Sequence, residues 1–550
     1  MSFPQENANR SGHGYADRLV AVACRAAIVL ILSLAACTSR PPTTHQESGV
    51  PAAQETPSVE SSGPTPEEII SDLQQTDLGS PEALNDRLEY AGQLIAADDA
   101  DCQKRLSLAQ SELDVVSADP SFNVVLPLGR ARRADLQYRL HAARASCKAE
   151  APQRLTELQQ ALAAAQQAVD LYRDALDYEA MTVAQFNVAA TQRLLGDDGA
   201  SLASLETAIA LDKEFGLRQD AIDNAGLLAR WRAGGGSKSD STAAGTVDFP
   251  ARTVTLNLWF PTEAQVSVQA DEAIVLDGGI SRGHVHRTFE QHVQFRRGAW
   301  VVSYQPGEIS YDVAQWPQKQ ADLRELAVSF ERAMGIPTFQ VGMKGKFERV
   351  RDLSAFSSQQ LAAARALALE HTIPASGTVQ LSEQQLQIMQ IALRSETIRV
   401  EAEEDYDLQV GMWIGATLEQ GVWYRLAAPL TLPGAHQLLI PYDLEFAYTR
   451  DVPCTGAATQ RACVEIVVHA SPQAHSIKSL MGNFDYPFVK AANASVHYWS
   501  ATCIRIVTDP ETLGLRVYDV RRYWHVSDKR ATREPVENRF ERIVTTFDYP

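Results

Sequence analysis

The segment AGGGSKSDSTAAGT, residues 233–246, divides the 550-residue chain into two parts with different periodicities. Before it, residues 67–232 are rich in Ala, Leu, Gln and Arg and poor in Gly and Pro, and apolar residues recur at helical spacing. After it, apolar and polar residues alternate, as in TVTLNLWF over residues 253–260. We therefore predict a multidomain chain with a Gly/Ser linker: an all-α helical array over 67–232, then a large, mainly antiparallel β domain with inserted helices (α+β) over 247–550.

The β half contains further strand patterns and two helical ones. RTFEQHVQFRRGAWVVSY predicts two strands that meet at Arg297 and Gly298. An apolar stripe predicts a helix from Leu323 to Met334, and Ser382 is placed to cap another. From about Ile398 to the end we expect strands, with the acidic run over residues 401–407 at a solvated strand end. A break near 376–397 leaves open whether this half is one domain or two.

The cysteines predict two disulfides. Cys102 opens one predicted helix and Cys147 lies at the end of another, so an antiparallel pair of helices brings them together. Cys454 and Cys463 bound the segment CTGAATQRAC, where a hairpin places them opposite each other. Cys503 remains, and we expect it to be a buried free thiol on an apolar strand.

The helical half contains a weak internal repeat with a period of 33 residues. The pattern of Ala168, Tyr172 and Ala175 recurs in Ser201, Leu205 and Ala208. Between these two segments, Val188 and Ala189 occupy the small or apolar positions of a preceding helix. The pattern resembles tetratricopeptide repeats, although the Trp-Leu-Gly start and terminal Pro of that family are absent. The resemblance implies a tetratricopeptide-like array, and a generic helical bundle is the alternative.

The N-terminus has the pattern of an export signal. Arginines precede the apolar run over residues 26–36, which is shorter than the ~20 residues that a membrane-spanning helix needs. The run ends in Leu34-Ala35-Ala36-Cys37, which resembles the lipobox of bacterial lipoproteins. The resemblance implies a signal peptide over 1–36, cleavage between Ala36 and Cys37, and fatty acyl chains such as palmitate on Cys37. Because Thr38 rather than Asp follows Cys37, it also implies sorting to the outer membrane, where we expect the protein to face the periplasm.

Residues 37–66 are rich in Pro, Ser, Thr and Glu and predict a disordered tether behind the lipidated Cys37. The chain has a formal net charge of −18, which opposes binding to nucleic acid or to an anionic membrane face. The expected contact with a membrane is therefore the lipid anchor alone.

No hydrolase, nucleotide-binding or metalloprotease motif occurs in the sequence, so we expect no enzymatic activity, catalytic residue or cofactor. His284, His286 and His292 share one face of a predicted strand, but neighbouring arginines disfavour a cation there. We expect a solvated strand face rather than a metal site.

Two functions are argued from these features, and a third class, a cell-envelope hydrolase, stays open with no candidate residue. The first is a non-enzymatic, lipid-anchored scaffold that binds an unidentified protein partner through the concave surface of its helical array. The alternative is a carrier of a hydrophobic small molecule or lipid, held in the β-rich half.

Overall fold

A computed structural model describes most of the two halves. The described residues are 81–97, 102–119, 122, 127–147, 151–233, 252–259, 261–276, 279–312, 335–370, 372–373, 377–378, 393–432, 435–454, 462–472, 496–528 and 535–549. The predicted signal peptide, Cys37, the tether and the linker over 233–246 lie outside these ranges, apart from residue 233 itself. The predicted helices at Leu323–Met334 and Ser382 also lie outside them.

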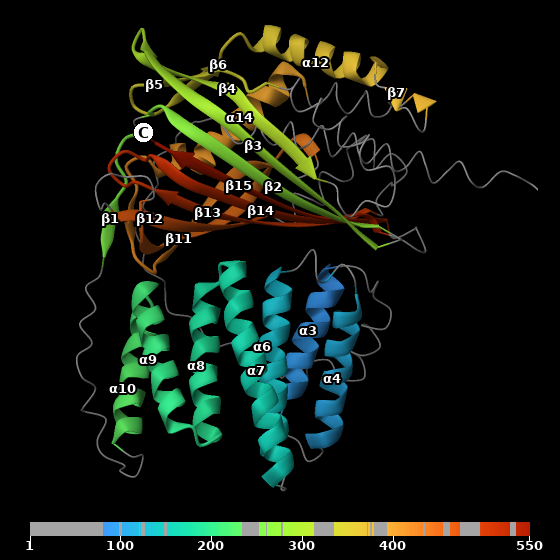
Figure 1. The fold of residues 1–550 in the computed structure, drawn as a ribbon, viewed down its shortest axis with the longest axis vertical. Coiled ribbons are helices and arrows are strands. Elements are labelled where there is room, and N and C mark those ends of the chain that lie inside the picture. Colours follow the sequence, from blue (N-terminus) through green and yellow to red (C-terminus); the bar gives the residue numbers. More distant parts are fainter. Residues whose placement is uncertain are drawn as a thin grey trace, which may run out of the picture.

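The first half is a helical array, as predicted. Its helices stand side by side, each beside its neighbours in sequence, with one end of the array against the β half (Figure 1). The helices are α3 (Pro81–Ala96), α4 (Cys102–Ala118), α6 (Pro127–Cys147), α7 (Ala151–Ala175), α8 (Tyr178–Leu194), α9 (Asp198–Glu214) and α10 (Arg218–Arg232).

Local sequence determines where α8 and α9 begin. The carboxylate of Asp177 accepts a hydrogen bond from the backbone nitrogen of Ala180 at 3.1 Å, and Asp197 accepts one from that of Ala200 at 3.0 Å. Each carboxylate thus caps a helix by satisfying a free N–H in the first turn. Gly196, between α8 and α9, has a φ of +82°, a left-handed conformation that glycine adopts without steric cost.

The repeat positions lie between the helices. Small residues at these positions let neighbouring helices approach closely. Ala168, Tyr172, Val188, Ala189, Ser201, Leu205 and Ala208 are buried, and Ala175 is half-buried. Such packing occurs in tetratricopeptide arrays and in bundles alike, so the family resemblance stays a prediction.

The second half is built on one antiparallel sheet of 11 strands in the order β10-β11-β12-β13-β14-β15-β2-β3-β4-β5-β6. Its last strand in sequence, β15, pairs with β14 on one side and with β2 on the other. The strands are β2 (Ala264–Leu276), β3 (Gly279–Arg296), β4 (Ala299–Asp312), β5 (Phe339–Gly342), β6 (Phe347–Val350), β10 (Trp423–Leu432), β11 (Ala435–Pro453), β12 (Ala462–Pro472), β13 (Val496–Thr508), β14 (Leu515–Asp528) and β15 (Pro535–Asp548).

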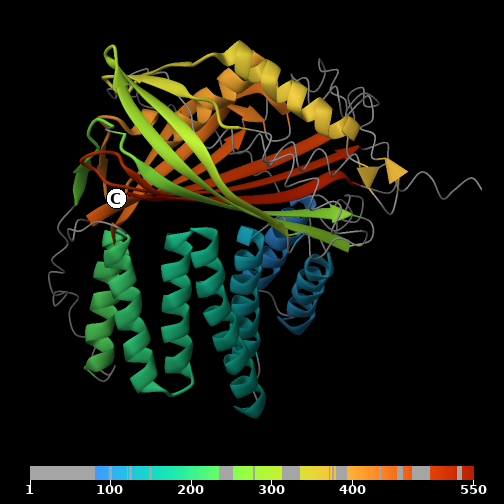
Figure 2. The ribbon, with the colours of Figure 1, turned by 45° about the horizontal axis from the view of Figure 1, so that its top comes forward.

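The sheet curls around helix α14 (Ser395–Gln409). This helix contacts β6, at one edge of the sheet, and β10 and β11, at the other edge. Helix α12 (Leu353–Glu370) packs against α14. In Figures 1 and 2, α12 and α14 lie on the concave side of the sheet and the helical array lies on its convex side.

One predicted feature of the β half is confirmed, and the hydrophobic core bears on a second question that the sequence left open. The hairpin β3–β4 turns at Arg297 and Gly298, whose φ angles of +53° and +81° fit a two-residue hairpin turn. One hydrophobic core includes Phe339, before the suspected break at 376–397, and Tyr406, after it. The main core of the β half therefore contains described residues from both sides of that break.

Two strand predictions are wrong. The acidic run over 401–407 lies in the middle of α14, because Ile398, Ala402 and Tyr406 recur every four residues and pack into the core. In the described part of the alternating run, residues 253–259, only β1 (Thr253–Thr255) is a strand, and it pairs with β9 (Thr417–Glu419) outside the main sheet. Two minor elements complete the described part of the β half. Strands β7 (Thr372–Ile373) and β8 (Gly377–Thr378) pair with each other in a small sheet of their own. A short 3-10 helix, η1 (Gly411–Trp413), follows α14.

The helical array contacts the convex face of the sheet through a buried ion-pair network and through a close backbone contact. Glu465 of β12 is fully buried, and its carboxylate accepts hydrogen bonds from Arg505 Nε at 2.6 Å and from Arg450 Nε at 3.2 Å. The Arg450 guanidinium also lies 5.1 Å from the ring centre of Phe215, at the end of α9. Gly216 and Gly421 meet backbone to backbone, so a Cβ at residue 421 would lie 2.6 Å from the Gly216 oxygen.

Candidate functional site

Two carboxylates of α14 face the concave side of the sheet. Glu401 and Asp405 are one helical turn apart and therefore lie on the same side of the helix. Each is only 2% exposed, in a helix whose neighbouring Ala402 and Tyr406 belong to the hydrophobic core. Burying carboxylates beside a core is costly unless they are neutralised or paired, so their environment decides their charge.

The sheet supplies polar groups opposite α14. Strand alternation places Tyr518 and Arg522 of β14 on the concave face, together with Val520, which is part of the core. The register pairs Arg522 with Thr502 of β13 on one side and with Glu541 of β15 on the other. Thr502 and Glu541 are buried, so a polar row crosses three neighbouring strands.

The two ion pairs that Arg522 forms with Asp405 and Glu541 are long. Arg522 Nη2 lies 3.9 Å from Asp405 Oδ1, and Arg522 Nη1 lies 3.9 Å from Glu541 Oε2. Both distances exceed that of a hydrogen bond. On the convex face, by contrast, Asp519 accepts hydrogen bonds from Arg521 Nη2 at 3.0 Å and from Arg542 Nη2 at 2.8 Å. We call Glu401, Glu404, Asp405, Tyr518, Arg522 and Glu541 the concave cluster.

The environment favours a neutral Glu401. Burial raises the pKa of Glu401 well above its usual value, and the nearby charges of Glu404 and Asp405 raise it further, against the opposing effect of Arg522. Burial alone would lower the pKa of Arg522, but Glu541 and Asp405 raise it, so the guanidinium stays charged. The cluster thus places the cation Arg522 among the acidic groups Glu401, Asp405 and Glu541.

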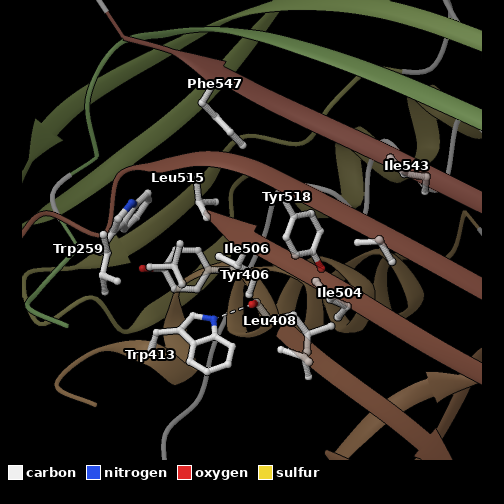
Figure 3. Close-up of a cluster of buried hydrophobic side chains, with 14 of the residues drawn as sticks. Trp259, Tyr406, Leu408, Trp413, Ile504, Ile506, Leu515, Tyr518, Ile543 and Phe547 are labelled. Atoms are coloured by element: carbon white, nitrogen blue, oxygen red, sulfur yellow. Dashed lines mark hydrogen bonds between the residues drawn. The ribbon is translucent and has the colours of Figure 1, made fainter. Parts of the chain in front are cut away.

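Tyr518 points its hydroxyl into this cluster. The residue is 1% exposed, and the hydroxyl forms no hydrogen bond with any described residue. The charges acting on it are those of Asp405, Arg522 and Glu404, and with burial they set its pKa well above the usual value for tyrosine. In Figure 3 its ring points from β14 toward the side of the sheet on which Tyr406 and Leu408 of α14 lie.

The surroundings of the concave cluster are apolar. Trp413 of η1 donates a hydrogen bond from Nε1 to the Leu408 oxygen at 2.8 Å, which satisfies its polar atom inside the core. Tyr406 donates to the Gly345 oxygen at 3.0 Å. The apolar side chains shown around them in Figure 3 come from several strands and loops: Trp259, Ile504, Ile506, Leu515, Ile543 and Phe547.

The predicted cysteine pairs are confirmed, and neither lies in the concave cluster. Cys102, at the start of α4, is bonded to Cys147, at the end of α6. Cys454 and Cys463 are bonded at the β11–β12 hairpin. Cys503 is a free thiol between the convex face and the array, and burial raises its pKa to about 12.

The three histidines do not come together. His284 Nδ1 lies 2.7 Å from Asp271 Oδ1, and His292 Nδ1 lies 3.0 Å from Glu263 Oε2. His286 bonds to the hydroxyl of Ser267 at 3.0 Å. Within the described ranges, His, Cys, Asp and Glu side chains form no group of three that could hold a metal ion.

The sequence prediction missed the concave cluster because it placed the acidic run on a strand. The spacing of Ile398, Ala402 and Tyr406 was the signal available for a helix. It would have put Glu401 and Asp405 beside the apolar face rather than in solvent. Three arginines of the last strands, Arg521, Arg522 and Arg542, form ion pairs within the chain.

Comparisons with known proteins identify no relative. No protein-family model matches the chain, and no curated protein matches it. Among solved structures, one titled "Lipid-protein interactions in lipovitellin" is similar at 9% identity and a TM-score of 0.24. The match covers 53% of this chain and spans only 25% of that one, and a likeness so weak supports no inference about function. In the described parts of the chain, every helix falls short of the length and apolarity that a membrane crossing requires.

Proposed function

We propose that the protein is a non-enzymatic binder of an amphiphilic small molecule or lipid, which it holds on the concave face of its curled sheet. The observation that carries this proposal is the concave cluster itself. It is a compact group of buried charges within an apolar face, which suits a ligand that has one polar end and one apolar end.

The size of the concave face supports the proposal. Eleven strands about 4.8 Å apart span roughly 50 Å of sheet. Helix α14 has 15 residues and helix α12 has 18, so they are roughly 22 Å and 27 Å long and each about 10 Å wide. The two described helices can cover only part of such a face, and the remainder is available to other chain segments or to a ligand.

The position of the helical array also favours this face. The array occupies the convex face through Glu465, Arg450 and the contact between Gly216 and Gly421. The concave face is therefore the side of the sheet on which the chain can bind a small molecule. Large apolar side chains exposed on the array, such as Leu108 and Leu155, are single residues on separate helices and do not favour a protein partner over a lipid.

The sequence supports an envelope location for this binder. The lipobox-like residues Leu34–Cys37 imply a lipid anchor on the outer membrane, facing the periplasm. The two disulfides fit an oxidising compartment. A lipid-anchored binder at a membrane would meet amphiphiles at the surface to which it is tethered.

The test is native mass spectrometry of the protein purified gently without detergent. A ladder of added masses separated by methylene units would support a bound amphiphile, because natural lipids vary in chain length. Displacement of the neutral fluorophore N-phenyl-1-naphthylamine by decyl maltoside would confirm binding in solution. A bare mass together with no binding of the fluorophore would overturn the proposal and return attention to a protein partner of the array.

An inner-face variant locates the ligand. Ile543→Trp fills space on the concave face, and Val544→Trp places the same ring at the next residue on the opposite face. We expect Ile543→Trp to weaken binding and Val544→Trp to leave it unchanged. Near-ultraviolet circular dichroism shows whether both variants keep a native fold.

A further inference from the structure

We propose that a corner of the β half, formed by two neighbouring turns, contacts an anionic membrane surface. One turn joins β3 to β4 and the other joins β5 to β6. We call their exposed apolar and basic side chains the basic tip: Phe295, Arg296, Arg297, Met343, Lys344 and Lys346. This inference does not depend on the proposed function, since none of these residues belongs to the concave cluster.

The register of the sheet brings the two turns together. Ala299, the first residue of β4, pairs with Arg296 of β3 on one side and with Gly342 of β5 on the other. Met343 follows Gly342 directly, so its turn begins beside the end of the β3–β4 hairpin. In Figures 1 and 2 this hairpin projects past β5 and β6, on the side of the β half away from the helical array.

The basic tip exposes large apolar side chains. Among the large apolar residues described in the β half, Met343 at 64% and Phe295 at 52% are the most exposed. The Phe295 ring packs on Trp300, with 4.8 Å between ring centres, in a row that continues to the buried Val341. The apolar concave face thus extends beyond the core and ends in an exposed ring. Apolar residues that gather at one projecting site, rather than singly, are typical of a contact surface.

The fold supports the β5–β6 turn from inside. Gly345 is buried in this turn and donates a backbone hydrogen bond to the Gly342 oxygen at 2.9 Å. Its own oxygen accepts the hydrogen bond from Tyr406 of α14. The turn is thus held against the core, while Met343 and Lys344 are exposed. Because the backbone of the turn is already fixed, binding through it costs little backbone entropy.

The basic tip also has a net positive charge. It carries four exposed basic side chains: Arg296, Arg297, Lys344 and Lys346. None of the four forms an ion pair within the described ranges. Lys346 interacts at longer range with the charge of Glu403, which already pairs with Arg399. On the neighbouring strand β6, the charges of Glu348 and Arg349 offset each other.

The overall charge of −18 does not prevent this contact. At physiological salt, interactions between exposed charges are screened beyond about 8 Å. Glu290, the acidic residue of β3, is six residues from Arg296, which is about 20 Å along an extended strand. An approaching surface therefore meets the local charge of the basic tip first. The prediction that the lipid anchor alone contacts a membrane assumes an evenly spread charge, whereas the described surface gathers four cations at one corner.

An anionic bilayer is the partner that these features favour. Basic side chains beside exposed apolar ones are typical of elements that lie at a membrane interface, with cations at the lipid phosphates and apolar groups at the acyl boundary. The lipid anchor predicted at Cys37 would hold the chain beside such a surface. Tethering raises the effective concentration to roughly millimolar, so even a weak contact would form and would orient the sheet on the membrane.

The test is co-flotation with vesicles of the chain from Thr38 onward, which keeps the described residues and lacks the predicted acylation site. Vesicles of phosphatidylcholine are compared with vesicles of equimolar phosphatidylglycerol and phosphatidylcholine. We expect binding to the anionic vesicles to be at least about tenfold tighter, and to weaken as salt is added. Wild-type protein that does not float with the anionic vesicles would overturn the proposal and leave an acidic protein surface as the partner of matching charge.

Paired variants test the cations. Arg296→Gln together with Arg297→Gln should weaken binding to the anionic vesicles about thirtyfold, or about fivefold for each charge removed. Both side chains are exposed, so the fold should persist. The matched control is Arg230→Gln together with Arg232→Gln, at the end of α10 farthest from the sheet (Figure 1). Equal binding by the two double variants would overturn the assignment to the basic tip, since binding would then depend on net charge alone.

Tryptophan reporters test whether the apolar side chains enter the bilayer. Met343→Trp places a reporter on the basic tip, and Leu194→Trp places one on the array at a similarly exposed position, 59% against 64%. Phospholipids brominated on their acyl chains quench tryptophan by contact. We therefore expect quenching beyond that of the wild type in Met343→Trp alone. A Met343→Trp variant quenched no more than Leu194→Trp would refute insertion of the basic tip.

Discussion

The substitution Asp212→Asn should stabilise the helical array at neutral pH and have little effect in acid. Asp212 of α9 is fully buried, and one of its oxygens accepts a hydrogen bond from Asn224 Nδ2 at 2.8 Å. Burial raises the pKa of Asp212 from 3.8 to about 6, and Asp220 adds to the rise, while hydrogen bonds from Asn224 and Thr182 oppose it. The folded array therefore prefers the protonated carboxyl.

The magnitude follows from linkage. The pKa in the folded state exceeds that in the unfolded state by about 2 units, which corresponds to about 3 kcal/mol. A raised carboxyl pKa means that the folded state binds more protons, so this stability is fully present below pH 3.8. It falls as the pH rises and is lost above about pH 6. An asparagine has no charge to bury, so the Asp212→Asn variant should keep this stability as the pH rises.

The assay is hydrogen–deuterium exchange of peptides from α8, α9 and α10, compared between variant and wild type at each pH. We expect the difference in the free energy of opening to grow by about 2 kcal/mol between pH 4 and pH 7, with the variant the more stable of the two. Asp223→Asn, an exposed change on α10, is the control and should show no such growth. A difference that does not vary with pH would refute a buried, protonated Asp212.

Three further predictions concern the junction and the disulfides. Gly421→Ala should separate the array from the sheet, because its Cβ would lie 2.6 Å from the Gly216 oxygen. The control, Gly196→Ala, has open space around its Cβ and should lower the stability of the array by only about 1 kcal/mol. Labelling of Cys503 by a maleimide measures the separation. Cys503 itself should react about a thousandfold more slowly than an exposed thiol at pH 8, since burial raises its pKa from 9.0 to about 12, and rapid native labelling would contradict this. Replacing Cys102 and Cys147 together by Ser opens a loop with a sequence separation of 45 and should destabilise the array by about 4 kcal/mol, measured by exchange in α4 and α6.

Local features of the sequence predicted local features of the fold. The Arg297-Gly298 turn, the helix ends at Cys102 and Cys147 and the switch from helical to alternating spacing each depend on residues close together in the chain. Interactions of this kind are determined by backbone preference and short loops, so a single sequence contains enough information to find them.

The candidate site could not be predicted in the same way. It requires α14 to lie inside the curl of the sheet, which depends on β15 pairing with β2 across more than half of the β domain. No local pattern encodes that pairing. The run of acids around Glu401 has the composition of a solvated surface, and only the spacing of Ile398, Ala402 and Tyr406 contradicts that interpretation. The sequence thus placed the charges in solvent, whereas tertiary packing buries two of them.

The position of β15 in the sheet has a consequence for how the protein is made. If the strands are followed from β10 to β15 and then from β2 to β6, each strand lies beside the next, so the sheet is a simple meander whose order in the chain has been rotated. The strands β2 to β6 leave the ribosome long before β15, their neighbour, has been synthesised. Their free edge at β2 must therefore stay unpaired until the last residues emerge, and a chain that lacks the final strand would consist of two half-sheets with nothing to pair them.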